Sequence, residues 1–269
     1  MSAACRPLES RNEGGAGASR STGPCSRPLP LADAPALAEM GLMKPMTEQH
    51  LAIFRRHMVE VIDVHFDLAS DEIGTDTLDG RLRDAMLQVP RHLFVPPQLA
   101  AVAYQDTPLP IGFDKTLSQP FIGALMLDLL DLAPGHRVLE VGTGLGYQAA
   151  VMAELGAAVW SVEIVEEFAE GARLRLGSLG HGVEIRVGDG SRGWAEHAPF
   201  DRILVTAGAP AVPEALKGQL AEGGRLVIPV GPAGFQHLTV VTRAGIRFEE
   251  EQRDSCVFVP LIGRQGWQP

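Results

Sequence analysis

The spacing of apolar residues in the first third of the chain predicts two helices. Thr47, a good N-cap, precedes a stripe at helical spacing formed by Leu51, Phe54, Met58, Val61 and Ile62. A second stripe ends at Pro90, which cannot continue a helix, and it consists of Leu78, Leu82, Ala85, Met86 and Val89. A long irregular stretch, Val95 to Gly112, follows, and stretches of this kind inside compact domains are usually functional. We therefore expect 44–115 to form a helical cap with a substrate loop.

Beyond residue 115, short apolar strands alternate with helices. A helix is expected after Pro120, and further helices are expected at 147–155, 166–179 and 213–220. The expected parallel strands are 137–141, 158–163, 183–187, 202–206 and 225–229, and the expected antiparallel C-terminal strands are 238–243 and 256–261. Such alternation forms a doubly wound, mostly parallel sheet. We therefore predict an α/β protein whose Rossmann-like core, 116–269, forms one structural unit with the N-terminal helical cap.

Composition and charge narrow the functional classes. The net charge of −10 argues against a nucleic-acid partner, because phosphate binding needs a concentrated basic surface. Cys5, Cys25 and Cys256 have neither the spacing of a disulfide framework nor that of metal ligands, so we expect no metal and a reducing compartment. We find no membrane-spanning segment and no signal-peptide pattern, so the expected location is the cytoplasm, without a membrane partner.

The N-terminal segment, 1–43, differs in composition from the rest of the chain. It is rich in Gly, Ser, Ala, Pro and Arg and has no sustained period, so it cannot bury enough apolar area to offset its ordering entropy. We therefore predict a disordered tail. Met40, Met43 and Met46 cluster where the periodic pattern begins. A functional tail and a translation start assigned too far upstream are both open interpretations.

Three features converge at the carboxyl ends of the first core strands, where a doubly wound sheet binds its ligand. Glu140-Val-Gly142-Thr143-Gly144-Leu-Gly146 is a loop whose glycines permit a tight turn and close approach to a ligand. Glu163 follows Gly142 by 21 positions, and its carboxylate can accept both ribose hydroxyls. Asp189, between Gly188 and Gly190, can reach an adenine amino group. Each feature alone is compatible with an ordinary turn or a solvated strand end, but together they favour a nucleoside ligand.

The glycine spacing distinguishes between nucleoside cofactors. The dinucleotide fingerprint G-x-G-x-x-G needs a glycine at position 147, where this chain has Tyr147. The loop reads G-x-G-x-G after the acidic Glu140, and this variant suits a ligand with an amino-acid tail rather than a pyrophosphate. S-adenosyl-L-methionine fits and NAD fits poorly. We therefore expect an S-adenosylmethionine-dependent methyltransferase.

Several further motifs resemble the protein-L-isoaspartate (D-aspartate) O-methyltransferase family. The most specific are Ala103-Tyr-Gln-Asp-Thr-Pro-Leu-Pro-Ile-Gly112 and Thr116-Leu-Ser-Gln-Pro120. The match runs from about Arg81 to Leu261 and includes, in the family's order, 142–150, 188–190, 198–201, 223–231 and 258–261. The resemblance implies a monomeric cytosolic enzyme that methylates the free α-carboxylate of L-isoaspartyl residues in damaged proteins or peptides and so initiates their repair. D-aspartyl residues are the second substrate class in the family's name.

The resemblance also implies roles for individual residues. Ser118 matches the family's active-site serine, and the segment around it closes over cofactor and substrate. The segment Val259-Pro260-Leu261 matches one that lines the peptide site. Asp106 is a candidate for the substrate site, but capping of the proline-rich turn is the role that we favour for it. From the loop features and the resemblance, the expected cofactor residues are Thr116, Leu117, Glu140, Gly142, Thr143, Gly144, Gly146, Glu163, Asp189 and Gly190.

The chemistry of methyl transfer favours a hydroxyl at position 118. A carboxylate is already ionised at neutral pH, so the nucleophile needs neither a general base nor a metal. The anion and the sulfonium neutralise each other in the transition state, so a clamping Arg or Lys would stabilise the ground state more. A hydroxyl such as that of Ser118 positions the anion with less penalty. The alternative role for Ser118 is the N-cap of the helix after Pro120, and the residues alone leave both roles open.

The chain departs from the family pattern at some positions, and its motifs also bear on rival functions. Asp114-Lys115 replaces the commonest glycine and glutamine, next to the substrate loop, so it can retune peptide choice. Methylation of a ribosomal peptide natural product by a member of the same family is the nearest alternative function. A nucleic-acid methyltransferase would need an Asn/Asp-Pro-Pro-Tyr-type segment where this chain has Thr206-Ala-Gly-Ala-Pro210. Intact cofactor and serine motifs argue against a non-catalytic binding protein.

Overall fold

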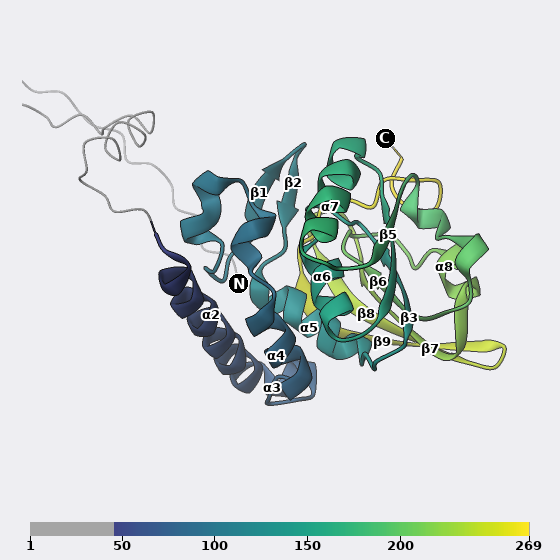
Figure 1. Ribbon diagram of the computed structural model, residues 1–269. Coiled ribbons are helices and arrows are strands. Elements are labelled where there is room, and N and C mark those ends of the chain that lie inside the picture. Colours follow the sequence, from purple (N-terminus) through teal and green to yellow (C-terminus); the bar gives the residue numbers. More distant parts are fainter. Residues whose placement is uncertain (1–45, 269) are drawn as a thin grey trace, which may run out of the picture. The chain divides into compact units, whose positions relative to one another are not determined.

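Seven strands form the main sheet of residues 46–268, which are those that the computed structural model describes (Figure 1). The predicted tail, 1–43, lies outside them. Five strands run parallel in the spatial order β5 (Val183–Val187), β4 (Ala158–Glu163), β3 (Arg137–Val141), β6 (Phe200–Val205) and β7 (Leu220–Val230). The antiparallel strands β8 (Gln236–Ala244) and β9 (Arg247–Cys256) extend the sheet beyond β7. The predicted doubly wound, mostly parallel sheet is confirmed.

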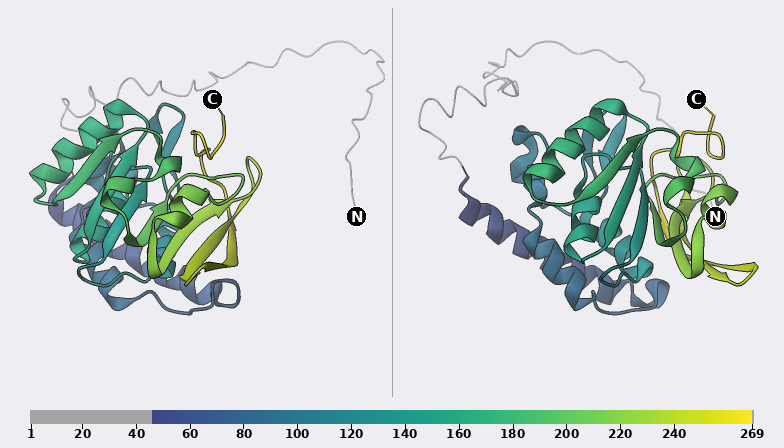
Figure 2. Two further views of the ribbon diagram at one scale, coloured as in Figure 1. Left: turned by 90° about the vertical axis from the view of Figure 1, so that its right-hand side faces the viewer. Right: turned by 45° about the vertical axis from the view of Figure 1, so that its right-hand side comes forward.

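Helices cover both faces of this sheet (Figure 2). They are α5 (Pro120–Leu130), α6 (Tyr147–Glu154), α7 (Glu166–Ser178) and α8 (Glu214–Gly218), with short 3-10 turns η4 (Gly190–Arg192) and η5 (Ala195–His197). The central strands are therefore buried on both sides, and Val138, Leu139 and Leu204 have no exposed surface. This burial explains why the parallel strands read as continuous apolar runs rather than as alternating ones.

The segment before the core, which we expected to form a helical cap, contains α2 (Glu48–Leu68), α3 (Ser70–Ile73), α4 (Gly80–Gln88) and the 3-10 turns η2 (Arg91–Phe94) and η3 (Pro97–Val102). Thr47 caps α2, and its side chain accepts a hydrogen bond from the amide of His50. The predicted stripe of α2 is wrong at Phe54, which is 43% exposed. Val59 and Phe66 face the core instead. The helix carries more apolar side chains than its core-facing side can hold, so Phe54 stays exposed.

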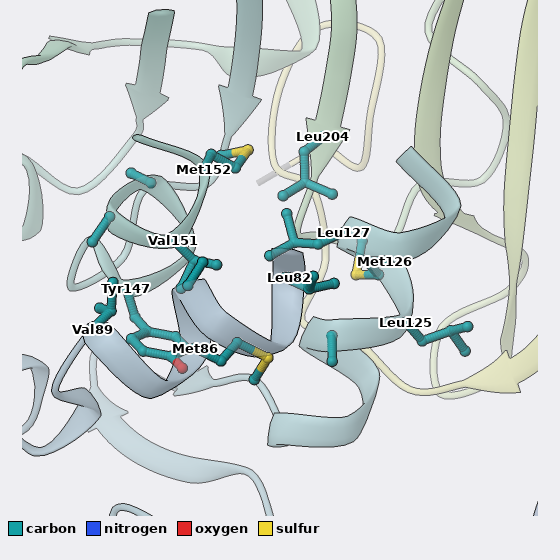
Figure 3. Close-up of a cluster of buried hydrophobic side chains, with 14 of the residues drawn as sticks. Leu82, Met86, Val89, Leu125, Met126, Leu127, Tyr147, Val151, Met152 and Leu204 are labelled. Carbon is teal, nitrogen blue, oxygen red and sulfur yellow. The ribbon is translucent and has the colours of Figure 1, made fainter. Parts of the chain in front are cut away.

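All five residues of the second predicted stripe are buried, which confirms α4. Asp79 caps this helix, since its carboxylate accepts hydrogen bonds from the amides of Arg81 and Leu82, each at 3.0 Å. Figure 3 shows how side chains of α4 pack against those of α5 and α6. One hydrophobic cluster runs from Leu51 in α2 to Leu238 in β8, so cap and sheet share a core.

The predicted strand 256–261 is wrong. The last strand, β9, ends at Cys256, and its residues are mostly charged and exposed because it is the edge of the sheet and pairs only with β8. The apolar residues that follow β9 leave the sheet and cross towards the ends of the parallel strands. There the amide of Gly208 donates to the carbonyl of Val259, and the amide of Leu261 donates to the carbonyl of Gly208, both at 2.8 Å.

The irregular stretch before α5 also contains local structure. β1 (Leu109–Gly112) pairs with β2 (Lys115–Leu117) in an antiparallel hairpin that hydrogen-bonds to no strand of the main sheet (Figure 1). Phe113 and Asp114 occupy the turn with φ values of 51° and 53°. The ring of Phe113 packs edge-on against that of Phe168 in α7, with centroids 5.3 Å apart. The hairpin therefore leans over the carboxyl ends of the parallel strands.

Candidate active site

A pocket opens at the carboxyl ends of the central strands, where a sheet of this kind binds its ligand. Its walls come from the glycine loop, the end of β4, the start of α7, the β1–β2 hairpin and the C-terminal segment. The lining residues are Ile111, Lys115, Thr116, Val141, Gly142, Gly144, Val162, Glu163, Ile164, Phe168, Gly190, Thr206, Ala207, Val259, Pro260, Leu261 and Ile262. We call this hollow the cofactor pocket.

Glycines form the floor of the cofactor pocket, where a side chain would be strained or would clash with neighbouring strands. Gly142 and Gly144 have φ values of 98° and 52°, which L side chains adopt only with strain. A Cβ atom on Gly142 would lie 2.4 Å from Thr206 Oγ1, and one on Gly190 would lie 2.4 Å from Val141 Cγ1. The missing side chains therefore let β3, β6 and η4 approach each other and leave bare backbone facing a ligand.

Glu163, the last residue of β4, places a carboxylate in the wall of the cofactor pocket. Its Oε2 accepts a hydrogen bond from the amide of Gly144 at 2.7 Å, and its Oε1 accepts one from the amide of Val165 at 2.9 Å. These bonds fix the glycine loop relative to β4. Ile164 follows directly and is 44% exposed, and Phe168 adds a ring. A carboxylate beside apolar surface suits a sugar with adjacent hydroxyls attached to a flat base.

Glu140 lies behind the glycine loop with no exposed surface. Its Oε2 accepts a hydrogen bond from Ser161 Oγ at 2.5 Å, and Ser161 Oγ is 2.6 Å from Thr143 Oγ1. The other oxygen, Oε1, has no hydrogen-bond partner. Burial raises the pKa of Glu140 to about 8, against the hydrogen bond from Ser161 and with the help of the nearby negative charge of Glu163. The protonated form therefore predominates at neutral pH.

Asp189 holds the C-terminal segment in place. Its Oδ1 accepts hydrogen bonds from the amide and hydroxyl of Ser191 at 3.0 and 2.6 Å, and its Oδ2 accepts one from the amide of Arg264 at 2.8 Å. Burial opposes ionisation, but these hydrogen bonds outweigh it and hold the pKa of Asp189 below its usual value. The charged carboxylate therefore anchors the backbone next to Gly190, and the side chain does not line the cofactor pocket.

A second hollow of about 750 Å³ adjoins the cofactor pocket, and Thr116 lines both. Its walls join the start of α5 to the residues around the end of β9, and every lining residue is uncharged: Pro108, Thr116, Ser118, Gln119, Ile122, Ser255, Cys256, Val257 and Phe258. We call it the serine hollow. Within the described chain, the hydrogen bond of Ser118 runs through its backbone carbonyl, which accepts from Arg91 Nη2 at 2.7 Å.

Asp106 takes the capping role that the sequence left open for Ser118. Helix α5 begins at Pro120, and the amide of Phe121 donates to Asp106 Oδ1 at 2.8 Å. The other carboxylate oxygen accepts from Gln119 Nε2 at 2.8 Å and lies 2.9 Å from His65 Nδ1. Asp106 lines neither hollow. It therefore organises the segment that carries Ser118, while the Ser118 hydroxyl is left to the serine hollow.

Residues 70–266 match the model of the protein-L-isoaspartate (D-aspartate) O-methyltransferase family. The chain belongs to this family. The protein-L-isoaspartate O-methyltransferase of Methylorubrum populi is 57% identical over 196 residues, which are 72% of this chain and 92% of the relative. That of Trichlorobacter lovleyi is 50% identical over 214 residues, 76% of this chain and 98% of the relative. A solved protein-L-isoaspartate O-methyltransferase, 29% identical, superposes with a TM-score of 0.67 over 79% of this chain and 67% of its own.

In this member of the isoaspartate methyltransferase family, the predicted cofactor residues divide into two groups. Thr116, Gly142, Gly144, Glu163 and Gly190 line the cofactor pocket. The other five lie behind its wall and shape it through hydrogen bonds, turns or packing: Leu117, Glu140, Thr143, Gly146 and Asp189. Within residues 46–268, no group of three or more His, Cys, Asp or Glu residues is arranged to hold a metal ion. No helix there could cross a membrane.

The structure also places residues that sequence reasoning missed. Val259-Pro260-Leu261, predicted for the peptide site, lines the cofactor pocket, whereas the preceding residues 255–258 line the serine hollow. Ile164 and Phe168 are further wall residues of the cofactor pocket. Ile164 had a local signal, since an apolar residue directly after a ligand-binding acid lies at the strand end. Residues 255–258 had none, because only the tertiary fold brings the end of β9 beside α5.

Proposed function

We propose that this protein transfers a methyl group from S-adenosyl-L-methionine to the free α-carboxylate of L-isoaspartyl residues in damaged proteins and peptides, and so initiates their repair. The observation that carries the proposal is that Thr116 lines both hollows, in a chain that belongs to this family. On one side lies a pocket with bare glycine backbone and the carboxylate of Glu163, and on the other lies the uncharged hollow that contains Ser118.

The cofactor pocket fits S-adenosyl-L-methionine by the chemistry of its groups. Glu163 can accept hydrogen bonds from the ribose hydroxyls, while Ile164 and Phe168 offer apolar surface to the adenine. Gly142 and Gly144 let the backbone approach the amino-acid tail, and a Cβ atom at either would be strained. When bound, the cofactor would supply a methyl group on a sulfonium, and the sulfur would leave as a neutral thioether. A dinucleotide fits less well, because Tyr147 stands where the dinucleotide fingerprint G-x-G-x-x-G needs glycine.

The serine hollow fits a reaction in which charge disappears. Its hydroxyl and amide groups, on Thr116, Ser118 and Gln119, can orient a carboxylate oxygen without adding a positive charge. An ammonium or guanidinium in the same place would bind the anion more tightly than the charge-neutralised transition state and would slow the reaction. Ser118 therefore holds the carboxylate, and the bound peptide would displace water from this open hollow. Catalysis consists of alignment in a dry site.

Finer features of the proposal concern the setting of the enzyme. We propose that it acts as a monomer in the cytoplasm and has isoaspartyl proteins, not nucleic acid or membranes, as its partners. The net charge of −10 and the absence of basic residues from the lining of the serine hollow argue against a nucleic-acid partner. The relatives are named protein-L-isoaspartate O-methyltransferases, which supports a repair role over the natural-product alternative.

Methyl transfer to matched peptides tests the proposed function. A synthetic peptide with one L-isoaspartyl residue should gain one base-labile methyl ester per chain, whereas its normal aspartyl twin should gain none, because only the isoaspartyl linkage leaves an α-carboxylate at that residue. Glu163→Ala should weaken cofactor binding, measured by calorimetry, by about 1.5–3 kcal/mol, the contribution of hydrogen bonds to a charged group. Equal methylation of both peptides, or of neither, would contradict the substrate assignment.

A further inference from the structure

Arg91 is a buried cation that lies between the glycine loop and the segment that carries Ser118. Only 1% of its surface is exposed. Its Nη2 donates to the carbonyl of Ser118 at 2.7 Å, and its Nε donates to the carbonyl of Ala103 at 2.8 Å. The guanidinium carbon lies 4.8 Å from the centre of the Tyr147 ring, which begins α6 directly after Gly146. One side chain therefore contacts three segments that are far apart in the sequence.

The hydrogen-bond partners of the Arg91 side chain are backbone carbonyls, not a carboxylate that would neutralise its charge. No ion pair within residues 46–268 involves this guanidinium, and Asp106 attracts it without a hydrogen bond. Burial of a cation without a bonded carboxylate is costly, so a packed apolar side chain would be the simpler way to stabilise the fold. An arginine instead offers planar donors in a rigid fork, which hold two carbonyl oxygens in a fixed relation.

The Ser118 segment is held from both ends. Arg91 fixes the carbonyl of Ser118, and Asp106 fixes the side chain of Gln119 and the amide of Phe121. The contact of Arg91 with the Tyr147 ring joins this segment to the helix that follows the glycine loop. A shift of Arg91 would therefore move the serine hydroxyl relative to the cofactor pocket.

We propose that Arg91 is the positioning residue that aligns the Ser118 hydroxyl with the cofactor pocket, a role that rests on the proposed function. Arg91 touches neither hollow, so it acts through the serine backbone. Loss of the fork should loosen the alignment of the carboxylate with the methyl group and leave the cofactor contacts in place. Misalignment by a fraction of an ångström lowers the rate of an aligned reaction, with losses of about a hundredfold for 1 Å.

The variants Arg91→Met and Arg91→Lys test this role, with Arg202→Met as the matched control. Arg202 is also mostly buried, and it donates to the carbonyls of Leu130 and Asp131 at the opposite end of α5. Arg91→Met should lower kcat for an isoaspartyl peptide roughly ten- to a hundredfold, with little change in the Kd of S-adenosylhomocysteine. Arg91→Lys keeps the charge but not the fork and should recover only part of the rate. Arg202→Met should lower Tm and leave kcat unchanged.

Chemical rescue separates positioning from general stability. In Arg91→Ala, added methylguanidinium can re-form the two carbonyl contacts and should raise kcat several-fold, whereas it should do nothing for Arg202→Ala. If Arg91→Met does not fold, Arg91→Lys and the rescue decide the matter. A stable Arg91 variant that turns over like the native enzyme, with only a lower Tm, would overturn the inference. An inactive native enzyme would instead refute the proposed function, and with it the positioning role that rests on that function.

Discussion

Ser118 and Glu140 are polar residues whose side chains lie in opposite environments. Ser118 lines an uncharged hollow, and its bond to the protein runs through the backbone. Glu140 is enclosed, and one of its oxygens has a partner while the other has none. We therefore expect substitution of Ser118 to change turnover and substitution of Glu140 to change the stability of the fold.

Ser118→Ala should lower kcat for an isoaspartyl peptide by roughly ten- to a hundredfold, because one hydrogen bond to a charged group contributes about 1.5–3 kcal/mol. The Kd of S-adenosylmethionine should change much less, since Ser118 does not line the cofactor pocket. Steady-state kinetics and calorimetry on the same preparation measure both effects. Asp106, not Ser118, caps α5, so Tm should stay near the native value. Near-normal turnover in a stable variant would remove Ser118 from the mechanism.

Glu140→Gln should flatten the pH dependence of stability between pH 5 and 8. The folded-state pKa of Glu140 is about 8 and its ordinary value is 4.5, so between them the folded protein holds a proton that the unfolded chain has released. The contribution of Glu140 to the free energy of unfolding is therefore fully present below pH 4.5 and is lost as the pH rises to about 8. At about 1.4 kcal/mol per pKa unit, the loss is on the order of a few kcal/mol. Urea unfolding of both proteins at several pH values measures it, and parallel curves would contradict the assignment.

Local sequence predicted much of the cofactor pocket but less of the serine hollow. Gly142, Gly144 and Glu163 were identifiable because their spacing repeats wherever a parallel sheet binds a nucleoside. The serine hollow needs residues 255–258, which lie more than 130 positions after Ser118. No local sequence pattern predicts that these two segments come together in the fold. The capping of α5 by Asp106 was also hidden, since the cap comes from 15 positions upstream rather than from the residue before the helix.

Among the secondary-structure elements, α4 and α5 begin with the same kind of contact but have different neighbours. Asp79 caps α4 from the preceding position, and its carboxylate is partly exposed. Asp106 caps α5 from another segment, is mostly buried, and also binds Gln119 and His65. Only the second contact lies beside the serine hollow.

Asp106→Ala should therefore lower both stability and kcat, whereas Asp79→Ala should lower stability alone. Loss of an N-cap costs about 0.5–2 kcal/mol, and the buried partners of Asp106 place it at the upper end of that range. Urea unfolding and peptide kinetics on both variants give the comparison. Equal losses of kcat in the two variants would show that helix stability, not the geometry of the Ser118 segment, limits turnover.

Elements at the edges of the sheet were the hardest to predict. The buried parallel strands were found because both of their faces are apolar. The edge strand β9 has solvent on one side, and its run of acidic residues carries no apolar alternation, so the apolar segment behind it was mistaken for the strand. The β1–β2 hairpin was missed because β2 has only three residues.

The molecule as a whole joins cap and sheet through one core, and this arrangement fixes where the two hollows meet. Around the two hollows, the cap provides α2 and the turn with Arg91, and the sheet provides the glycine loop and Glu163. The C-terminal segment covers the ends of the strands. Alternation of strands and helices indicated this division of the chain. The convergence of three separate segments on Arg91 was not predictable, because it depends on how cap and core pack.

The position of Thr116 in the walls of both hollows has a consequence for the order of events in turnover. Because the hollows adjoin without overlapping, both ligands can be bound at once, and no covalent enzyme intermediate is needed. Initial-rate plots at several fixed concentrations of the second substrate should therefore intersect rather than run parallel. S-adenosylhomocysteine should compete with S-adenosylmethionine but not with the peptide. Parallel plots would indicate that the methyl group rests on the protein between two half-reactions, which a direct in-line transfer does not allow.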